Sequence, residues 1–110
     1  MAVKDFKYAT LFDVYGSMLS EKQSYALEMY YCDDLSLSEI ADNTGITRQG
    51  VRDQIKHAEE ELDNLERKLG LVAKFGELRG VLKEIEEKLC DNDIQSALSL
   101  CERAGLLIEA

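Results

Sequence analysis

The chain has 110 residues and carries 13 Lys and Arg against 22 Asp and Glu, which gives a formal net charge of −9 at pH 7. An acidic balance of this size excludes indiscriminate binding to nucleic acid, because such binding comes from neutralising phosphates with basic side chains. The sequence contains no proline, and helix-forming residues fill every segment. These features predict an all-α protein, without β-type alternation of useful length.

Two amphipathic helices are predicted ahead of residue 35. The first spans about residues 4–18, where apolar side chains recur every three or four positions: Phe6, Tyr8, Leu11, Phe12, Tyr15 and Leu19. The second starts at a capping box of Ser20 and Gln23 and ends near residues 32–34. Short helices bury too little surface to be stable alone, so these two provide a packing surface for the elements that follow.

Residues 35–57, with the sequence LSLSEIADNTGITRQGVRDQIKH, have the spacing of a helix-turn-helix. Ser36 and Glu39 form a second capping box, which predicts that a helix begins at Leu37. We expect this helix to end at Gly45, because glycine adopts the positive φ of a tight turn at no steric cost. The inward-facing side chains of the motif are predicted to be Ile40, Ala41, Ile46, Val51 and Ile55.

Thr47 is the predicted N-cap of the second helix of the motif. An apolar seam at heptad spacing runs on from it, through Val51, Ile55, Ala58, Leu62, Leu65, Leu69 and Val72. We therefore predict one long helix from residue 47 to about residue 69. Its outer face is charged and is expected to be solvated: Glu59, Glu60, Glu61, Asp63, Glu66, Arg67 and Lys68.

Glycines at positions 70, 76 and 80 predict a break or kink after the long helix, because each lowers helix stability by about 1 kcal/mol relative to alanine. The next helix has an apolar face made of Leu78, Leu82, Ile85 and Leu89. A cap cluster at residues 91–93 starts a last helix over residues 94–104. Its apolar face is expected to be Ala97, Leu98 and Cys101, with Gly105 as its C-cap. Residues 106–108 are too apolar for a free tail, so we expect them to pack against the protein or a partner.

The chain is predicted to form a helix-turn-helix domain over residues 1–70, which includes the long helix, and a helical extension over residues 71–110. A single compact unit is the alternative. At 1.5 Å per residue the long helix measures about 35 Å, and the first two helices cover only its front half. Its rear half must meet the C-terminal helices folded back on it, or a second subunit. We favour a homodimer formed by the long helix and the extension.

The reactive residues argue against a catalytic or metal site. Cys32, Cys90 and Cys101 lack Cys-x-x-Cys spacing, and their apolar neighbours predict small buried hydrophobes in a reducing cytosol. The one histidine, His57, has no nucleophile pattern beside it, and no phosphate-binding glycine loop is present. We expect no enzyme activity, no cofactor and no metal. With no signal peptide ahead of Phe6 and no apolar run of membrane-spanning length, a cytoplasmic protein without membrane contact is expected.

Residues 11–69, with the sequence LFDVYGSMLSEKQSYALEMYYCDDLSLSEIADNTGITRQGVRDQIKHAEEELDNLERKL, resemble the YlxM family of small bacterial helix-turn-helix proteins, also called the p13 family. The resemblance covers about residues 11–89. The helix-turn-helix half is also similar to the fourth region of bacterial RNA polymerase sigma factors, which reads the −35 element: residues 19–23 match the entry, and residues 35–41 and 46–55 match the motif. The resemblance implies a DNA-binding regulatory protein. Family genes lie beside those of the signal recognition particle, which implies a link to that pathway.

The first two turns of the long helix are predicted to enter a DNA major groove. Arg48 or Arg52 is placed for bidentate binding to guanine, and Gln49 to read adenine. Thr47 and Lys56 are placed to hold phosphates. The full set of candidate nucleic-acid-binding residues is Ser38, Thr44, Thr47, Arg48, Gln49, Arg52, Asp53 and Lys56. Exposed side chains of these types are also ordinary on a solvated helix, so the helix-turn-helix spacing carries the hypothesis.

An interaction module is the alternative function. In this hypothesis the helix-turn-helix is a scaffold, and the long helix or the apolar C-terminus docks on a protein or RNA–protein particle, for which the resemblance favours the signal recognition particle. The acidic surface suits a basic protein partner. Helix-turn-helix units are also reused for protein contacts, so the motif alone does not decide between DNA and protein.

Overall fold

The computed structural model of the protein describes residues 4–109, and within them it contains six α-helices and no strand. The predicted all-α class is confirmed. The contacts divide the chain into two units, Met1–Leu69 and Gly70–Ala110. Residues 1–3 and 110 lie outside the described residues. The ends of the predicted domain ranges and the start of the segment that was expected to lack a signal peptide fall on them. No helix of residues 4–109 has the length and apolar character needed to cross a membrane.

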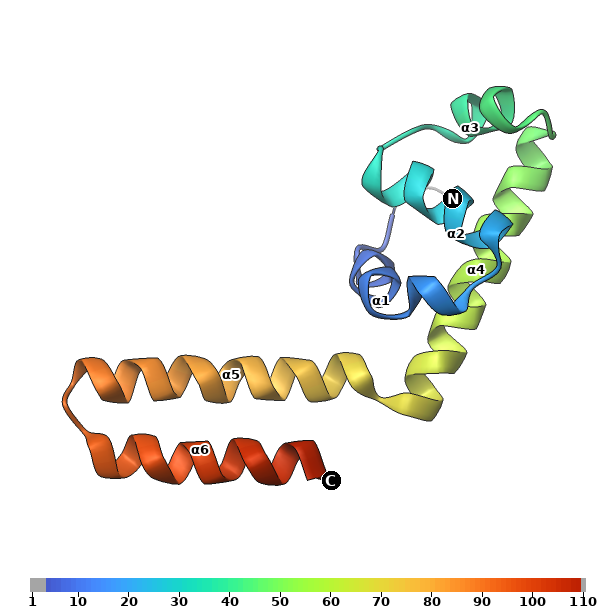
Figure 1. The fold of residues 1–110 in the computed structure, drawn as a ribbon. Helices are drawn as coiled ribbons and strands as arrows, with labels where there is room; N and C mark the ends of the chain where they lie inside the picture. Colours follow the sequence, from blue (N-terminus) through green and yellow to red (C-terminus); the bar gives the residue numbers. More distant parts are fainter. Residues whose placement is uncertain (1–3, 110) are drawn as a thin grey trace. The chain divides into compact units, whose positions relative to one another are not determined.

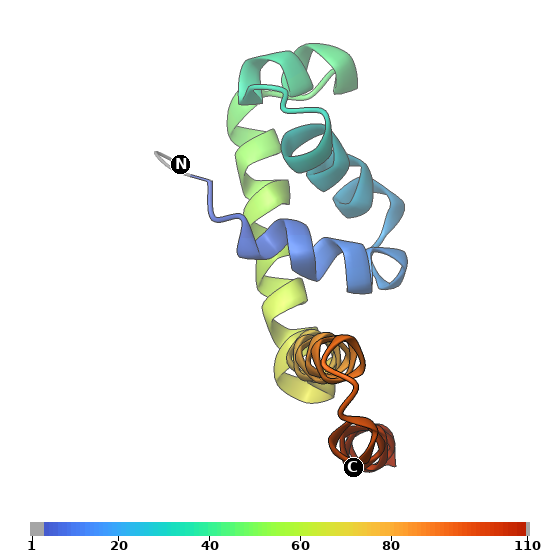
Figure 2. The same ribbon diagram turned by 90° about the vertical axis from the view of Figure 1, so that its left-hand side faces the viewer.

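The first unit consists of four helices, and three of them lie along one side of the fourth (Figures 1 and 2). In chain order they are α1 (Lys7–Tyr15), α2 (Glu21–Leu27), α3 (Leu37–Thr44) and α4 (Arg48–Leu69). A 3₁₀ turn, Gly16–Met18, follows α1, and a π-helical turn, Glu28–Cys32, follows α2. The predicted first helix thus begins about three residues later than expected, and the capping box of Ser20 and Gln23 opens α2 as predicted.

The core of this unit forms around the inner stripe of α4. Its predicted seam residues Val51, Ile55, Ala58 and Leu62 are buried. The other helices contribute the fully buried side chains Tyr15, Leu27 and Ile40. Of the predicted inward-facing set, Ala41 is half-buried and Ile46 is 37% exposed, so the prediction for Ile46 was wrong. Ile46 lies in the turn between α3 and α4, where the short connection leaves it at the rim of the core.

The predicted solvated face of α4 is wrong for three of its carboxylates. Tyrosine hydroxyls from α1 and the π-helical turn donate hydrogen bonds to them: Tyr8 to Asp63, Tyr15 to Glu66, and Tyr31 to Glu59. Burial raises the pKa of Tyr8 and of Tyr31, and the acceptor carboxylates raise both further. Burial also raises the pKa of Glu59, although the hydrogen bond from Tyr31 opposes that shift. The heptad seam identified the apolar stripe of α4 but not the polar contacts beside it.

The second unit is an antiparallel hairpin of α5 (Leu71–Cys90) and α6 (Ile94–Glu109), which lie side by side (Figure 1). The predicted break falls at Gly70, whose φ is 63°, while α5 passes through the other two candidate glycines. Asp93 caps α6, since its carboxylate accepts a hydrogen bond of 3.2 Å from the Ser96 N–H. Hydrogen bonds from Ser96 lower the pKa of Asp93.

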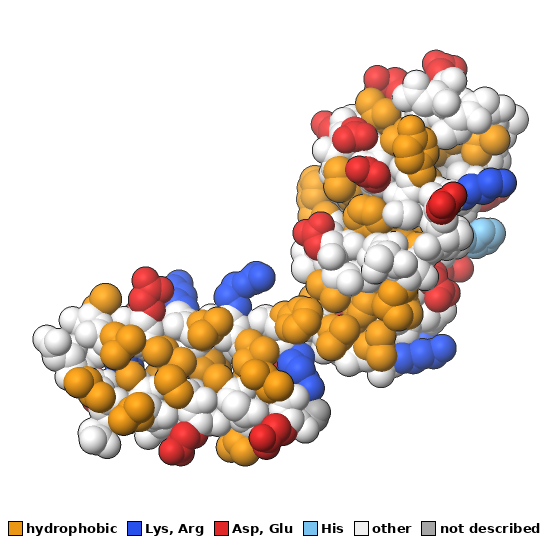
Figure 3. Space-filling view, viewed as in Figure 1, with side chains coloured by type: hydrophobic (Ala, Val, Ile, Leu, Met, Phe, Trp, Pro, Cys, Tyr) orange, Lys and Arg blue, Asp and Glu red, His pale blue; other side chains and the backbone are white. Residues whose placement is uncertain are grey.

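The packing stripes of the hairpin match the predicted ones only in part. On α5 the buried residue is Val81, and the predicted face residues Leu82 and Leu89 are exposed. On α6 the buried residue is Ala97, while Leu98 is exposed. The predicted face of α6 is therefore right for Ala97 and wrong for Leu98 and Cys101, and on α5 the predicted Leu78 and Ile85 are half-buried. Figure 3 shows hydrophobic side chains gathered on the surface of this hairpin.

Two further expectations about the C-terminal half are corrected by the structure. The last helix continues through Gly105 to residue 109, so Gly105 is not a C-cap and residues 106–108 are helical rather than a tail. The three cysteines, Cys32, Cys90 and Cys101, are all exposed in the single chain and not buried as predicted. Their apolar neighbours predicted the helices correctly but did not identify the side of the helix on which each thiol lies.

Candidate nucleic-acid interface

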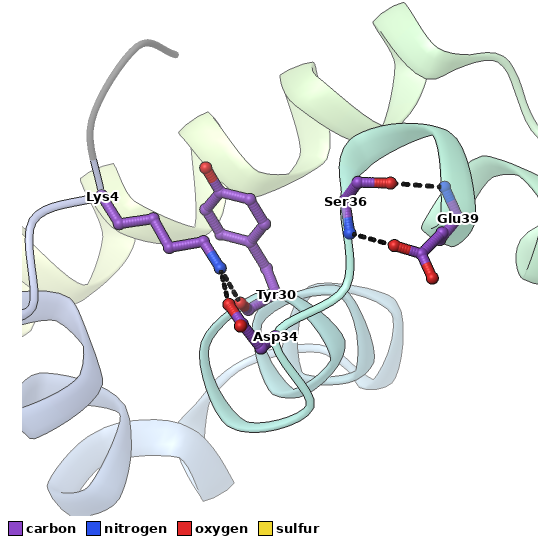
Figure 4. A network of polar contacts seen from close by, with 5 residues as sticks. All are labelled: Lys4, Tyr30, Asp34, Ser36 and Glu39. Carbon is purple, nitrogen blue, oxygen red and sulfur yellow. Dashed lines mark hydrogen bonds and ion pairs between the residues drawn. The ribbon is translucent and has the colours of Figure 1, made fainter.

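The loop that leads into α3 is fixed by two polar networks (Figure 4). The Ser36 side chain accepts a hydrogen bond of 3.1 Å from the Glu39 N–H, and the Glu39 carboxylate accepts one of 3.0 Å from the Ser36 N–H. Beside this capping box, the Lys4 ammonium donates to the Tyr30 carbonyl at 2.8 Å and pairs with Asp34 at 2.7 Å. The hydrogen bond from Lys4, together with its positive charge, lowers the pKa of Asp34. The start of α3 is therefore held by contacts on both sides of residues 34–36.

The turn between α3 and α4 has the predicted sharp bend. Gly45 has a φ of 75°, in the left-handed region that costs other residues about 1 to 2 kcal/mol. Its N–H donates to the Ala41 carbonyl at 2.9 Å and closes α3. The Thr47 hydroxyl accepts a hydrogen bond of 3.0 Å from the Gly50 N–H, which confirms Thr47 as the cap of α4.

Five of the candidate residues lie exposed on the first nine residues of α4: Arg48, Gln49, Arg52, Asp53 and Lys56. The three basic ones recur every four positions, so they lie on one face of the helix. On α3, Ser38 is also exposed. Arg48, Gln49 and Arg52 line a shallow concavity together with Leu37 from the start of α3. The bend thus brings α3 and the outer face of α4 to one surface.

Hydrogen bonds distinguish the candidates from one another. The Thr44 hydroxyl donates to the Ile40 carbonyl at 2.8 Å, so its single proton is already used. The Thr47 hydroxyl acts as an acceptor in its cap, so its proton is available for a phosphate oxygen. The Gln49 amide donates to Asp53 at 3.0 Å, and reading a base would require this bond to be exchanged. Thr47 is therefore better placed than Thr44 for a phosphate contact.

Sequence reasoning missed a second concavity on the other side of the turn. Lys22 and Tyr25 from α2 line it together with Thr44, Ile46 and Gln54. Lys22 is exposed, and Tyr25 is 56% exposed. The available signal was an exposed basic residue and an aromatic residue three positions apart on α2, but only the fold brings them to the turn.

Arg48, Arg52 and Lys56 take no part in the ion pairs that join Lys4 to Asp34 and Lys7 to Asp63. Further along α4, Glu59 is turned toward Tyr31, while Glu60 and Glu61 are exposed. The described residues contain no group of three or more His, Cys, Asp and Glu side chains that could hold a metal ion. The local chemistry is therefore that of a small basic face on an acidic protein.

A family model described as "Putative helix-turn-helix protein, YlxM / p13 like" (UPF0122) matches residues 2–101. The chain belongs to this family. A UPF0122 protein of Desulforamulus reducens is 49% identical over 84 residues, which are 76% of this chain and 72% of the relative. Another, from Shouchella clausii, is 40% identical over 104 residues, 94% of this chain and 95% of the relative. The predicted resemblance to the YlxM family is confirmed, and the family is described by its helix-turn-helix rather than by a reaction.

Proposed function

We propose that the protein is a DNA-binding regulatory protein that places the first two turns of α4 in a major groove. The observation that carries the proposal is the exposed basic row Arg48, Arg52 and Lys56, presented by a capped helix directly after a left-handed turn. In helix-turn-helix proteins the N-terminal residues of the second helix contact base edges. In this protein, the residues that the motif predicts to contact bases all lie at this end of α4.

Each side chain has a role that follows from its chemistry. The planar guanidinium groups of Arg48 and Arg52 can bind the O6 and N7 acceptors of guanine bidentately. Gln49 can read adenine once it releases Asp53. Lys56 and the Thr47 hydroxyl hold phosphates, and Ser38 adds a contact from α3. Thr44 contributes less, because its hydroxyl proton is bound by its own helix.

The charge distribution supports selective rather than general binding. The protein carries −9 overall, so it is repelled by DNA outside the basic face. The exposed Glu60 and Glu61 lie on the turn of α4 that follows the basic row. A duplex can therefore approach the start of α4 but not its middle. This arrangement favours a site recognised by a few base contacts over binding driven by phosphate alone.

We propose further that the protein acts as a homodimer linked to the signal recognition particle pathway. A dimer reading one face of B-DNA would place its two α4 helices about 34 Å apart, or at a multiple of that distance. Regulation of genes for protein targeting would explain how a DNA-binding protein is linked to the signal recognition particle pathway. The resemblance to the YlxM family supports the pathway, and the small size of the chain supports the dimer.

An accessory module that binds a protein or RNA of the particle is the second candidate. The observation that favours it is the exposed apolar surface of α5 and α6, which the DNA contact does not use. The acidic surface of the chain would suit a basic protein partner. In this case the helix-turn-helix would act as a scaffold.

Selection of fragments from the organism's own genome, run beside a pull-down, separates the two candidates. DNA binding predicts that the protein enriches a common sequence and that Arg48→Ala abolishes the enrichment. The accessory role predicts co-purification with the particle's GTPase or RNA that survives nuclease treatment of DNA and is unchanged by Arg48→Ala. Failure to enrich any sequence, together with such co-purification, would overturn the DNA-binding proposal.

A further inference from the structure

One side of the α5–α6 hairpin carries exposed apolar side chains from both helices. Its residues, which we name the α5–α6 face, are Phe75, Leu82 and Leu89 on α5 and Ile94, Leu98, Cys101 and Ile108 on α6. The six hydrophobic side chains are 45% to 67% exposed, and Cys101 is exposed as well. Hydrophobic side chains over both helices are visible in one view of the molecule (Figure 3).

Helical spacing places the two rows on the same side of the hairpin. Leu82 follows the buried Val81 by one residue, and Leu98 follows the buried Ala97 by one residue. One residue turns a helix by about 100°, so each row is rotated in the same sense away from the α5–α6 contact. Because the two helices run antiparallel, equal rotation about each axis points both rows to one side. The face is therefore a single surface that runs along the hairpin.

The hairpin has too small a core to leave this face in water. In its described part the buried hydrophobic side chains are only Val81 and Ala97. Units of about 40 residues usually need a disulfide, a metal or association with another chain to be stable. The cysteines are free, and residues 4–109 offer no metal-binding group. Association with another apolar surface would stabilise the hairpin.

We propose that the α5–α6 face of a second copy of the chain covers this surface, so that two hairpins form a four-helix bundle. The six hydrophobic side chains offer roughly 500 Å² of apolar surface, most of the about 800 Å² per partner that a stable interface buries. The seven residues of the face are uncharged, and the exposed Arg79 and Glu86 border its α5 row, as the polar rim of an apolar interface does.

The need to keep the α5–α6 face covered also favours a second copy of the chain as its partner. A surface that the hairpin must keep covered needs a partner that is present whenever the protein is, and its own copy meets that condition. At Gly105, within the α6 row, an added Cβ would meet nothing within 4 Å, so a second backbone can approach α6 closely there. Antiparallel hairpins that pair into four-helix bundles are an established solution for such faces.

This inference rests on the homodimer of the proposed function and names its contact surface. Its test uses no DNA, so the dimer and the DNA contact can fail independently of each other. Sedimentation equilibrium of the full chain should give twice the 12.4 kDa of one copy. Leu98→Glu should return the mass to 12.4 kDa at the same concentration. Ser99→Glu adds the same charge at the next exposed position, off the face, and should leave the dimer intact. A monomeric wild-type protein, or a dimer that survives Leu98→Glu, would overturn the proposal.

Thiol labelling of the wild-type protein gives a second reading that does not depend on a variant folding. Cys101 lies in the face, whereas Cys90 lies on another side of the hairpin, and both are exposed in the single chain. In the dimer Cys101 should react with a maleimide at least tenfold more slowly than Cys90, and dilution into the monomer range should remove the difference. Equal labelling of the two thiols at high concentration would contradict the proposal, as would protection of Cys101 in a protein of monomer mass.

Discussion

The hydroxyl of Tyr8 on α1 donates a hydrogen bond of 2.8 Å to the carboxylate of Asp63 on α4, 55 positions further along the chain. Together with Tyr31 and Glu59, this pair joins the N-terminal segment to the middle of the helix whose first turns form the candidate interface. The position of α4 therefore depends on tyrosines that keep their protons.

Stability above about pH 10 should depend on these two tyrosines. The pKa of Tyr8 and of Tyr31 is raised in the folded protein, while a tyrosine in the unfolded chain titrates near pH 10. Their contribution is therefore full below about pH 10 and is lost as the pH rises from there through the folded pKa. Urea unfolding at a series of alkaline pH values should show that the free energy of unfolding falls steeply with pH. Each tyrosine changed to Phe should reduce the slope of this fall by the equivalent of up to about one proton.

The control for this measurement is Tyr25→Phe, on the exposed ring of α2. It should leave the alkaline slope unchanged. If the slope after Tyr8→Phe and Tyr31→Phe were as steep as that of the wild type, groups other than these tyrosines would cause the loss of stability at alkaline pH.

Removing the cap of α4 should destabilise the first unit. Thr47→Ala leaves the Gly50 N–H without its side-chain acceptor, and loss of an N-cap of this kind costs about 1 kcal/mol. Thr47→Ser keeps the hydroxyl and should retain most of the stability. Chemical unfolding followed by circular dichroism measures both. Equal stability of the Ala variant and the wild type would mean that the cap contributes nothing in solution.

The turn before α4 should tolerate only a residue that accepts a positive φ. Gly45→Ala meets no atom within 4 Å, so its cost of about 1 to 2 kcal/mol comes from the backbone alone. Gly76→Ala, inside α5, should instead stabilise its helix by about 0.5 to 1 kcal/mol. Thermal unfolding of the two variants should thus shift in opposite directions. A shift of the same sign in both would contradict the left-handed turn.

Two basic residues of α4 should differ in what they contribute to DNA binding. Arg52→Ala should cost about 1 to 3 kcal/mol on a selected site and relax its preference at one base pair. Lys56→Ala should weaken binding evenly across sequences and reduce the slope of log K against log salt by about 1. Titrations of the selected site and of single-base variants at several salt concentrations separate the two effects. If the two substitutions gave the same pattern, the division into base and phosphate contacts would be wrong.

The sequence predicted most of the local structure around the interface, for identifiable reasons. The capping boxes at Ser20 and Ser36, the cap at Thr47 and the turn at Gly45 each depend on residues within a few positions of one another. Their chemistry is therefore complete in a short window of sequence. The buried residues of α4 followed from a heptad seam, because that seam meets three other helices.

The predictions that failed concern which residues of a helix are buried and which are exposed to solvent. Glu59 has the composition of a solvated residue, and only Tyr31, 28 positions earlier, makes it a half-buried acceptor. The predicted faces of α5 and α6 were right only in part, because apolar residues occur on more than one side of these helices: Leu82, Leu89 and Leu98 are exposed, whereas Val81, which was not predicted, is buried. The concavity of Lys22 and Tyr25 depends on the distance between α2 and the turn, which no local pattern contains.

The most direct test of the proposed function compares two arginines of the same helix. Arg48 lies exposed in the first turn of α4 and Arg67 in its last, so each change to Ala removes one positive charge from α4. In a gel-shift titration with a selected DNA fragment, Arg48→Ala should weaken binding by about 5- to 150-fold, and Arg67→Ala should leave it unchanged. Equal effects of the two substitutions, or no effect of Arg48→Ala, would contradict the placement of the first turns of α4 in the major groove.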